Sequence, residues 1–434
     1  MPLERILLVT VQLDPRFEPA PVPPIPVQGL GRTTWPIADE AAELKELATA
    51  AGCRCVGELT ARRHRPVAGT FLGAGKLDEI AQQVDAQQAQ VVVFNQELSS
   101  AQQRNIEEIV HVKTIDRTQL ILDIFAQRAR SQEGKIQVEL AQLRYLLPRL
   151  VGRGVMLSRL GGGIGTRGPG EQKLEVDRRR IRARITRLGA ELKQLGRRRA
   201  ATRSRRQEAA VPVAALVGYT NAGKTTLLNR LTGAAGSVRD QLFTTLDPLA
   251  RRMRLPSGEW IVVTDTVGFL HHLPHHLIEA FRATLEEARD ADLLLHVLDV
   301  SQPLVLEHGA AVEEVLATLK LQDKPVISVL NKCDRLGEPT PLAALQRAYA
   351  PAAAISAKTG AGLERLHRLI KDQLDLLLIE PTQLCIPLER SDVVASVYRL
   401  GQVLRREDAN GLIELLVRLP AQLKARLAPY VKAG

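Results

Sequence analysis

The chain has 434 residues, a formal net charge of +11 and only 3% aromatic residues. This length exceeds what one hydrophobic core can hold, so we expect about two to four domains. The scarcity of aromatic side chains argues against base stacking spread along the surface, whereas the positive charge favours an anionic partner. Most of the charge lies in one segment, because the stretch from Arg178 to Arg206 contains thirteen Lys or Arg and one acid, Glu191.

Several protein classes are disfavoured by what the sequence lacks. The four cysteines include a C-x-C at 53–55, but no second pair stands at the spacing of a metal site, and four thiols make no disulfide framework in so long a chain. The first residues lack the basic region and cleavage site of a signal peptide, and no apolar run approaches the ~20 residues of a membrane span. We therefore expect a cytoplasmic protein with no membrane span.

Residues 1–130 alternate short apolar runs with amphipathic segments. This β-α-β alternation predicts a small, mostly parallel N-terminal α/β domain. A helix over 100–110 is expected to begin after a cap at Ser99 or Ser100. Strands are expected at 4–13, 53–60, 89–98 and 112–117, and the other helices at 40–52 and 75–88.

Residues 131–208 show a different pattern, with apolar residues spaced alternately four and three apart in two runs. Two such seams joined by a loop predict an antiparallel helical hairpin. The loop holds the glycine-rich stretch RLGGGIGTRGPGEQKLE (159–175), and the second helix carries the basic residues. A polyanion partner is favoured over a merely solvated charged face. The seam residues are Ile136, Leu140, Leu143, Leu147 and Leu150, then Ile181, Ile185, Leu188, Leu192 and Leu195.

Residues 209–374 return to β-α-β alternation, with buried strands expected at 211–218, 259–268, 292–300 and 325–334. Most of these strands end in a polar residue, as in a doubly wound, mostly parallel sheet that gathers ligands at the carboxyl ends of its strands. Residues 375–434 predict a small C-terminal α/β domain, with strands at 383–388 and 411–419, a helix at 392–401 and one last helix.

The motif G-x-x-x-x-G-K-[ST] runs from Gly218 to Thr225, directly after an expected strand and before an expected helix. Glycines at these positions let backbone N–H groups and a helix N-terminus surround phosphates. Lys224 would contact the β- and γ-phosphates, and the Thr225 hydroxyl would bind Mg²⁺. This P-loop is the strongest single signal in the chain.

Three further motifs follow in a fixed order. Asp265–Gly268 (DTVG) ends a strand, where an Asp can hold Mg²⁺ through water and a glycine N–H can sense a γ-phosphate. Asn331–Asp334 (NKCD) ends a later strand, and an Asp there can accept hydrogen bonds from the two donors of guanine, which adenine lacks. Ser356–Lys358 (SAK) would supply a loop amide for guanine O6. The ordered set predicts a GTP site.

Together these motifs resemble those of the translation-factor-like GTPases, and GYTNAGKTT, LFTTLDP, DTVGF, NKCD and SAK are similar to the Obg–HflX branch. SRLGGGIGTRGPGEQKLEVDRRRIR resembles the signature of the HflX family itself, with Gln172 where the family pattern has Thr. The order of domains is also similar to that family, so the resemblance covers essentially the whole chain.

The resemblance implies a cytoplasmic, monomeric GTPase that uses Mg²⁺, binds GTP and GDP, and contacts the large (50S) ribosomal subunit and its RNA to split or recycle stalled ribosomes. It implies that Thr245, with Thr244 as the alternative, closes over Mg²⁺. Phe269 stands where Ras-type GTPases have the Gln that orients water, so hydrolysis is expected to be slow alone. A monovalent cation such as K⁺ near Asn221, or the ribosome, would accelerate it.

The candidate catalytic residues are Lys224, Thr245 and Gly268, and the candidate metal ligands are Thr225 and Thr245. The candidate nucleotide-binding residues are Gly218, Tyr219, Thr220, Asn221, Ala222, Gly223, Lys224, Thr225, Phe243, Thr244, Thr245, Leu246, Asp247, Asp265, Thr266, Val267, Gly268, Asn331, Lys332, Cys333, Asp334, Ser356, Ala357 and Lys358.

Some alternatives stay open. The alternative functions are a regulatory GTPase acting on a protein partner, a ribosome-assembly GTPase and an RNA-remodelling ATPase. Gly75-Lys76 belongs to an incomplete P-loop, so ATP binding by the N-terminal domain is only weakly supported. The histidines of HHLPHH (271–276) favour a mobile polar loop over a metal site. The G-x-G-x-x-G beginning at Gly163 follows a heptad helix and lacks the acid of a dinucleotide fingerprint, so we expect it to approach RNA.

Overall fold

The computed structural model describes residues 3–14, 35–150, 169–208, 211–234, 243, 249–270, 282–337, 340–376, 381–409, 411–419 and 421–432. The chain forms two compact units. The first comprises Met1–Gln194, Arg239–Asp247 and Leu270–Ala283, and the second comprises Leu195–Val238, Pro248–Phe269 and Thr284–Gly434. The predicted glycine-rich loop around Gly163 and the histidine cluster at 271–276 lie outside the described residues.

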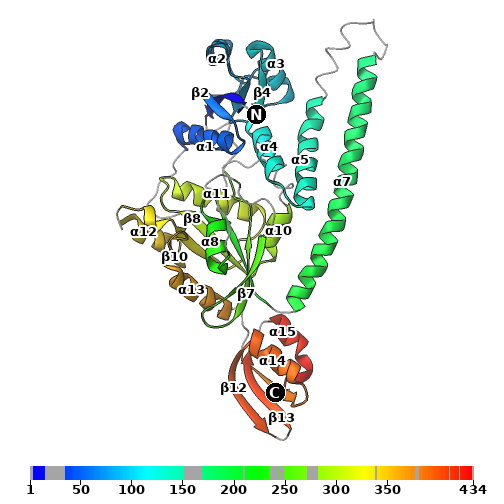
Figure 1. Cartoon of the computed structure of the whole chain (residues 1–434), viewed down its shortest axis with the longest axis vertical. Helices are drawn as coiled ribbons and strands as arrows, with labels where there is room; N and C mark the ends of the chain where they lie inside the picture. The colour runs from blue at the N-terminus through cyan, green and yellow to red at the C-terminus, as the bar shows by residue number, and fades with distance from the viewer. Residues whose placement is uncertain are drawn as a thin grey trace. The chain divides into compact units, whose positions relative to one another are not determined.

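A four-stranded parallel sheet in the order β2-β1-β3-β4 centres the first unit (Figure 1). Alternate residues of β1, such as Leu7 and Val9, share a core with α2 and α3, while Ile6 and Leu8 are buried on the side that faces α1. The parallel α/β fold is as predicted. The elements are β1 (Arg5–Leu13), α1 (Ile37–Ala50), β2 (Arg54–Arg63), α2 (Ala74–Gln87), β3 (Val91–Phe94), α3 (Ser100–Val110) and β4 (Lys113–Asp116).

Local sequence explains where α3 begins. The Ser99 hydroxyl accepts a hydrogen bond from the Gln102 backbone N–H, and the Gln102 side chain accepts one from the Ser99 backbone, so the two residues form a capping box. The predicted cap is confirmed at Ser99. Helix α4 (Arg117–Arg128), which follows β4 without a loop, was not predicted from the sequence pattern.

Two long helices complete the described part of the first unit: α5 (Gln132–Arg149) and α7 (Pro169–Glu208), which continues into the second unit. Figure 1 shows them side by side, and Arg184 of α7 donates two hydrogen bonds to Glu139 of α5, at 2.7 and 2.8 Å. Leu188 of the predicted seam is only 1% exposed. The C-terminal end of α5 is connected to β4, because Tyr145 Oη donates a hydrogen bond to Asp116 Oδ1 at 2.8 Å.

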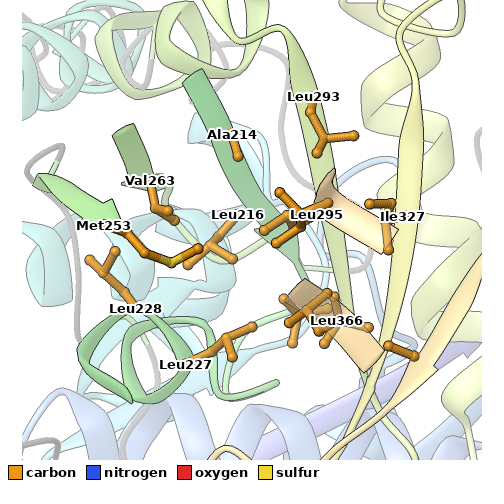
Figure 2. Packing of buried hydrophobic residues seen from close by; sticks show 14 of the residues in the cluster. Ala214, Leu216, Leu227, Leu228, Met253, Val263, Leu293, Leu295, Ile327 and Leu366 are labelled. Carbon is orange, nitrogen blue, oxygen red and sulfur yellow. The ribbon is translucent and has the colours of Figure 1, made fainter. Parts of the chain in front are cut away.

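The second unit contains a six-stranded sheet in the order β10-β9-β8-β5-β7-β6, in which β6 alone is antiparallel to its neighbour. Helices α8 and α13 cover one face and α11 and α12 the other. Figure 2 shows Leu216, Leu295 and Ile327 from adjacent strands packed with Leu366 of α13. The mostly parallel sheet agrees with the sequence, but strands β6 and β10 were not predicted. The elements are β5 (Val213–Gly218), α8 (Lys224–Thr232), β6 (Leu249–Arg254), β7 (Trp260–Asp265), α10 (Arg282–Asp290), β8 (Leu293–Asp299), α11 (Val305–Thr318), β9 (Val326–Asn331), α12 (Thr340–Ala348), β10 (Ala352–Ala354) and α13 (Leu363–Leu376).

The end of the chain forms a small antiparallel sheet in the order β11-β13-β12, packed against α14 and α15. Two of its strands, β11 (Thr382–Pro387) and β13 (Leu412–Arg418), and the helix α14 (Ser391–Leu400) match the sequence prediction. Strand β12 (Gln402–Ala409) was missed, because its run of exposed charged residues lacks the apolar alternation of a half-buried strand. The last helix is α15 (Ala421–Arg426).

Candidate functional site

The P-loop joins β5, a central strand, to α8 at the carboxyl end of the parallel sheet. Gly223 has φ of +93°, a conformation that side chains disfavour, and a Cβ there would approach Asn331 Nδ2 to 2.3 Å. The sequence requires glycine at this point for both reasons. The loop then enters α8, whose N-terminal backbone N–H groups supply an anion-binding end.

Lys224 is buried within this loop. Its Nζ donates hydrogen bonds to the carbonyl oxygens of Gly218, at 2.9 Å, and Tyr219, at 2.7 Å. Burial lowers the pKa of Lys224 to about 8, and the nearby carboxylate of Asp265 acts in the opposite direction. The ammonium group is therefore held in place by the loop, and a negatively charged ligand would compensate for the water it has lost.

The hydroxyl of Thr225 donates a hydrogen bond to Asp265 Oδ2 at 2.7 Å. Asp265 is 0% exposed and ends β7, which is paired in parallel with β5. A hydroxyl and a carboxylate beside a phosphate-binding loop form an oxygen donor set that suits Mg²⁺. These two side chains fit the metal that the motif implies. Within the described ranges, no cluster of three or more His, Cys, Asp or Glu residues forms a metal site of another kind.

The DTVGF segment lies alongside the P-loop. Thr220 N donates to Phe269 O at 2.8 Å, and Phe269 N donates to Gly218 O at 3.1 Å. Gly268 lies so close that a Cβ would meet Thr220 Cα at 2.8 Å and Lys224 Nζ at 3.1 Å. Only glycine fits there. The Phe269 side chain is 2% exposed, so the residue after this glycine is packed in the interior.

Asn331 connects the P-loop to the SAK loop. Its Nδ2 donates to Ala222 O at 2.8 Å, and its Oδ1 accepts from Ala357 N at 2.9 Å. Because the side chain is 2% exposed, both hydrogen bonds are shielded from water. The phosphate end and the base end of the candidate site are thus fixed to each other by one amide group.

Asp334 lies on the surface at the base end of the site. A hydrogen bond from the Ser356 side chain lowers the pKa of Asp334, so the carboxylate is charged and available as an acceptor. Ser356 is buried, and its Oγ accepts from Thr359 N at 3.1 Å, which shapes the loop that carries Ala357 and Lys358. An exposed carboxylate beside a rigid loop amide is the donor–acceptor arrangement that guanine needs.

Other predicted residues stabilise the backbone of the site through burial or hydrogen bonds. Thr266 Oγ1 donates to Leu216 O at 2.7 Å and is 0% exposed, which ties the end of β7 to β5. Val267 is 4% exposed. The Cys333 backbone N–H donates to Ile355 O at 3.1 Å. Asn221, the proposed neighbour of a monovalent cation, is half-buried with φ of +60°.

Asp299, Arg230 and His308 contribute to the site but were missed from the sequence. Lys332 Nζ pairs with Asp299 Oδ2 at 2.7 Å, across the ends of β9 and β8. Arg230 of α8 donates to Ala357 O at 3.1 Å and also to the Lys358 carbonyl. Only Asp299 had a detectable signal, because it ends a strand just as Asp265 does.

His308 of α11 is the third missed contributor, because its ring stacks on the Tyr219 ring with centroids 4.0 Å apart. Burial lowers the pKa of His308 to about 4, so the imidazole is neutral at pH 7. A stacked histidine therefore supports the first turn of the P-loop without adding charge to it.

Phe243 belongs to the first unit, whereas the P-loop and the DTVG, NKCD and SAK residues belong to the second. Its ring is 2% exposed and packs edge-on against Phe125 of α4, with centroids 4.6 Å apart. The remaining residues of that motif, Thr244, Thr245, Leu246 and Asp247, lie outside the described residues, so their predicted roles stay predictions.

Comparison with known proteins agrees with this geometry. Residues 38–126 match a family model described as GTP-binding GTPase N-terminal, residues 128–206 match GTP-binding GTPase Middle Region, and residues 213–332 match 50S ribosome-binding GTPase. The GTPase HflX of Caldanaerobacter subterraneus subsp. tengcongensis is 48% identical over 389 residues, which cover 90% of this chain and 89% of that protein.

The chain belongs to the HflX family of GTPases. The HflX GTPase of Escherichia coli is 44% identical over 381 residues, covering 87% of this chain and 89% of that protein. A GTP-binding protein from Sulfolobus solfataricus, solved in complex with GDP, is 24% identical over 86% of this chain and all of that chain, with a TM-score of 0.44. The family assignment rests on the sequence relatives. No helix in the described part of this HflX-family chain is long and apolar enough to cross a membrane.

Proposed function

We propose that this HflX-family GTPase is a nucleotide-dependent switch that binds the large ribosomal subunit and splits or recycles stalled ribosomes. The observation that carries the nucleotide part is the Asn331 bridge, which joins a P-loop to a guanine-type loop through two buried hydrogen bonds. The ribosome part is supported by the match of residues 213–332 to a model described as 50S ribosome-binding GTPase. Its location in the cytoplasm and its monomeric state remain predictions.

Phosphate binding would use the P-loop. Lys224, already held by two loop carbonyls, would contact the β- and γ-phosphates, and the phosphates would stabilise its charged form. Mg²⁺ would supply charge neutralisation at those phosphates when bound. The Thr225 hydroxyl oxygen would hold it directly through a lone pair while its O–H still donates to Asp265, and Asp265 would hold it through water.

Base selection follows from Asp334. Its exposed carboxylate would accept from the N1–H and amine of guanine, while the Ser356–Lys358 loop would supply a backbone amide for O6. Adenine offers no matching pair of donors, so Asp334 would lose its hydrogen bonds to water without gaining others. The site would therefore exclude ATP.

Hydrolysis would depend on ordering by a partner. Phe269 is buried and has no polar group with which to orient water. Gly268, which approaches Lys224, would donate its N–H to the γ-phosphate, and Thr245 would close over the metal. The missing polarity would come from the ribosome or from a monovalent cation such as K⁺ near Asn221.

RNA contact would come from α7. Ten Lys or Arg residues of this helix lie between Arg179 and Arg203. Several of them, including Arg179, Arg180 and Arg182, are exposed. Neutralising phosphates with such residues releases counterions, so binding would weaken steeply with salt.

Sedimentation of purified large subunits with the full chain tests this function. We expect binding with GTP or a non-hydrolysable analogue that exceeds binding with GDP and persists at moderate salt. Arg179→Gln combined with Arg182→Gln should weaken it, whereas Arg347→Gln on the exposed side of α12 should not. No binding at low salt would reject the ribosome as partner and favour a regulatory GTPase that acts on a protein.

A further inference from the structure

The hairpin formed by β6 and β7 carries three side chains that the nucleotide site does not use. Arg252 pairs across the strands with Val262, and Arg254 pairs with Trp260. Directly opposite residues of an antiparallel pair share a face, so Arg252, Arg254 and Trp260 lie together. The alternate residue Met253 is 2% exposed and belongs to the core on the other face. We call Arg252, Arg254 and Trp260 the hairpin face.

The hairpin face is exposed and positively charged. Trp260 is 46% exposed, which is unusual for so large an apolar ring, and both arginines are exposed. Among the described residues, neither arginine pairs with an acid, and Arg254 Nε donates only to the Gly258 carbonyl, at 3.1 Å. The neighbouring acid, Glu259, is held by Lys371 at 2.8 Å. The two guanidinium charges are therefore uncompensated within this part of the structure.

The turn that joins the two strands is well anchored. Leu255 N donates to Glu259 O at 2.9 Å, and Gly258 N donates to Leu255 O at 2.8 Å. The ion pair between Glu259 and Lys371 fastens this turn to α13. A rigid turn presents the hairpin face in one geometry, so a ligand would lose little affinity to ordering it.

We propose that the hairpin face binds single-stranded RNA, with the two arginines on successive phosphates and the Trp260 ring stacked on a base. Exposed aromatic rings with flanking cations are how single strands are held without reading sequence. An anionic strand is favoured over an apolar protein surface, because the two arginine charges beside Trp260 are not paired with acids among the described residues. The inference rests on the proposed function only in naming ribosomal RNA as the natural ligand.

The hairpin face is well separated from the chemistry. Strand β7 runs from Trp260 to Asp265, so the two ends lie about 17 Å apart at the rise of a strand. Substitutions at Trp260 should therefore leave GTP hydrolysis without ribosomes unchanged.

Fluorescence tests the contact directly, because the chain has two tryptophans and Trp35→Phe leaves Trp260 as the single reporter. The probe is a single-stranded oligoadenylate of roughly 12 nucleotides, within the size range that such sites cover. We expect quenching of Trp260, and about tenfold weaker binding for Trp260→Ala with partial recovery in Trp260→Phe, since stacking contributes ~1–3 kcal/mol per base. Melting curves of each variant confirm folding.

Charge is tested with Arg252→Gln combined with Arg254→Gln. Loss of two phosphate contacts should lower the slope of log affinity against log salt by about 1.4, at ~0.7 per contact on a single strand. The matched control is Arg347→Gln on α12, which packs on β10 at the opposite edge of the sheet and should bind like the unmodified chain. Equal effects of the two changes would overturn the proposal.

Three other results would overturn the proposal. The first is no binding of the oligonucleotide, and the second is unaltered Trp260 emission when filter retention shows that the oligonucleotide is bound. The third is quenching by polyglutamate equal to that by oligoadenylate. Large subunits separate this inference from the proposed function. If they bind the unmodified chain and Trp260→Ala equally, the hairpin contact is rejected and the proposed function stands. If they do not bind while oligoadenylate quenches Trp260, the contact is supported and the proposed function fails.

Discussion

Replacing Asn331 by alanine tests whether one amide holds the two ends of the nucleotide site together. The change removes the donor to Ala222 O, at 2.8 Å, and the acceptor for Ala357 N, at 2.9 Å, from a side chain that is 2% exposed. Each buried backbone group left without a partner costs ~1–3 kcal/mol, so for two groups we expect a total loss of about 2–6 kcal/mol. At about 2–4 °C per kcal/mol for a domain of this size, the melting temperature should fall by roughly 4–24 °C.

The assay is thermal unfolding of the full chain with and without GDP, together with a GDP titration. Because both loops are proposed to contact the nucleotide, GDP affinity should fall at least about tenfold, which is ~1.4 kcal/mol. The matched control for folding is Asp334→Asn, three residues along the same motif but on the surface, which should melt like the unmodified chain in the absence of GDP. An Asn331→Ala variant that melts within about 2 °C of the unmodified chain and binds GDP normally would refute the bridging role.

Three more predictions address base selection, charge and packing. Asp334→Asn should shift preference from guanine to xanthine nucleotides in competition binding, and unchanged GTP selectivity would contradict the assignment of that carboxylate. The pKa of Lys224 is lowered to about 8, so its neutral form accumulates above that pH. GDP affinity should therefore decline above pH 8 by up to about tenfold per pH unit. The nucleotide-free protein should gain stability between pH 8 and 10.5, because in that range the unfolded chain binds more protons than the folded protein does. A flat pH profile of GDP affinity, equal to that of Lys224→Met, would exclude this coupling. Leu188→Ala, at a side chain 1% exposed on α7, should lower the free energy of unfolding by ~2–5 kcal/mol in urea titrations, whereas Val176→Ala, 44% exposed, should change it by less than about 0.5 kcal/mol. Equal effects of those two would show that the seam is not packed.

Much of the GTPase domain was predictable because its chemistry is encoded in short motifs next to strongly apolar strands. The P-loop, the DTVG turn and the NKCD turn each follow a buried strand, and the parallel sheet brings their ends to one edge. The Ser99 cap was predictable for a similar reason, since a capping box involves residues only three apart.

What the sequence did not reveal depends on long-range pairing. Strand β6 has three arginines in six residues and becomes a strand because it pairs with β7. The contact between Arg230 and the carbonyls of the SAK loop joins residues 127 and 128 positions apart. The periodicity of apolar residues in the sequence does not predict such contacts, because they form only when the fold brings α8 and that loop to the same end of the sheet.

The packing of Phe243 against Phe125 has a practical consequence for dissecting this chain. A truncated protein that begins at residue 209 would retain Phe243 but lose α4, and a ring that is 2% exposed would be left in water. Burial of such a ring contributes roughly 1.5–3 kcal/mol of stability, which the shortened protein would lose. It would also expose an apolar ring in the motif that is expected to close over the nucleotide. The hydrolysis rate of the shortened protein would then be measured without the contact between Phe243 and Phe125. We expect it to differ from the rate of the 434-residue chain, even though every residue that binds phosphate would be present.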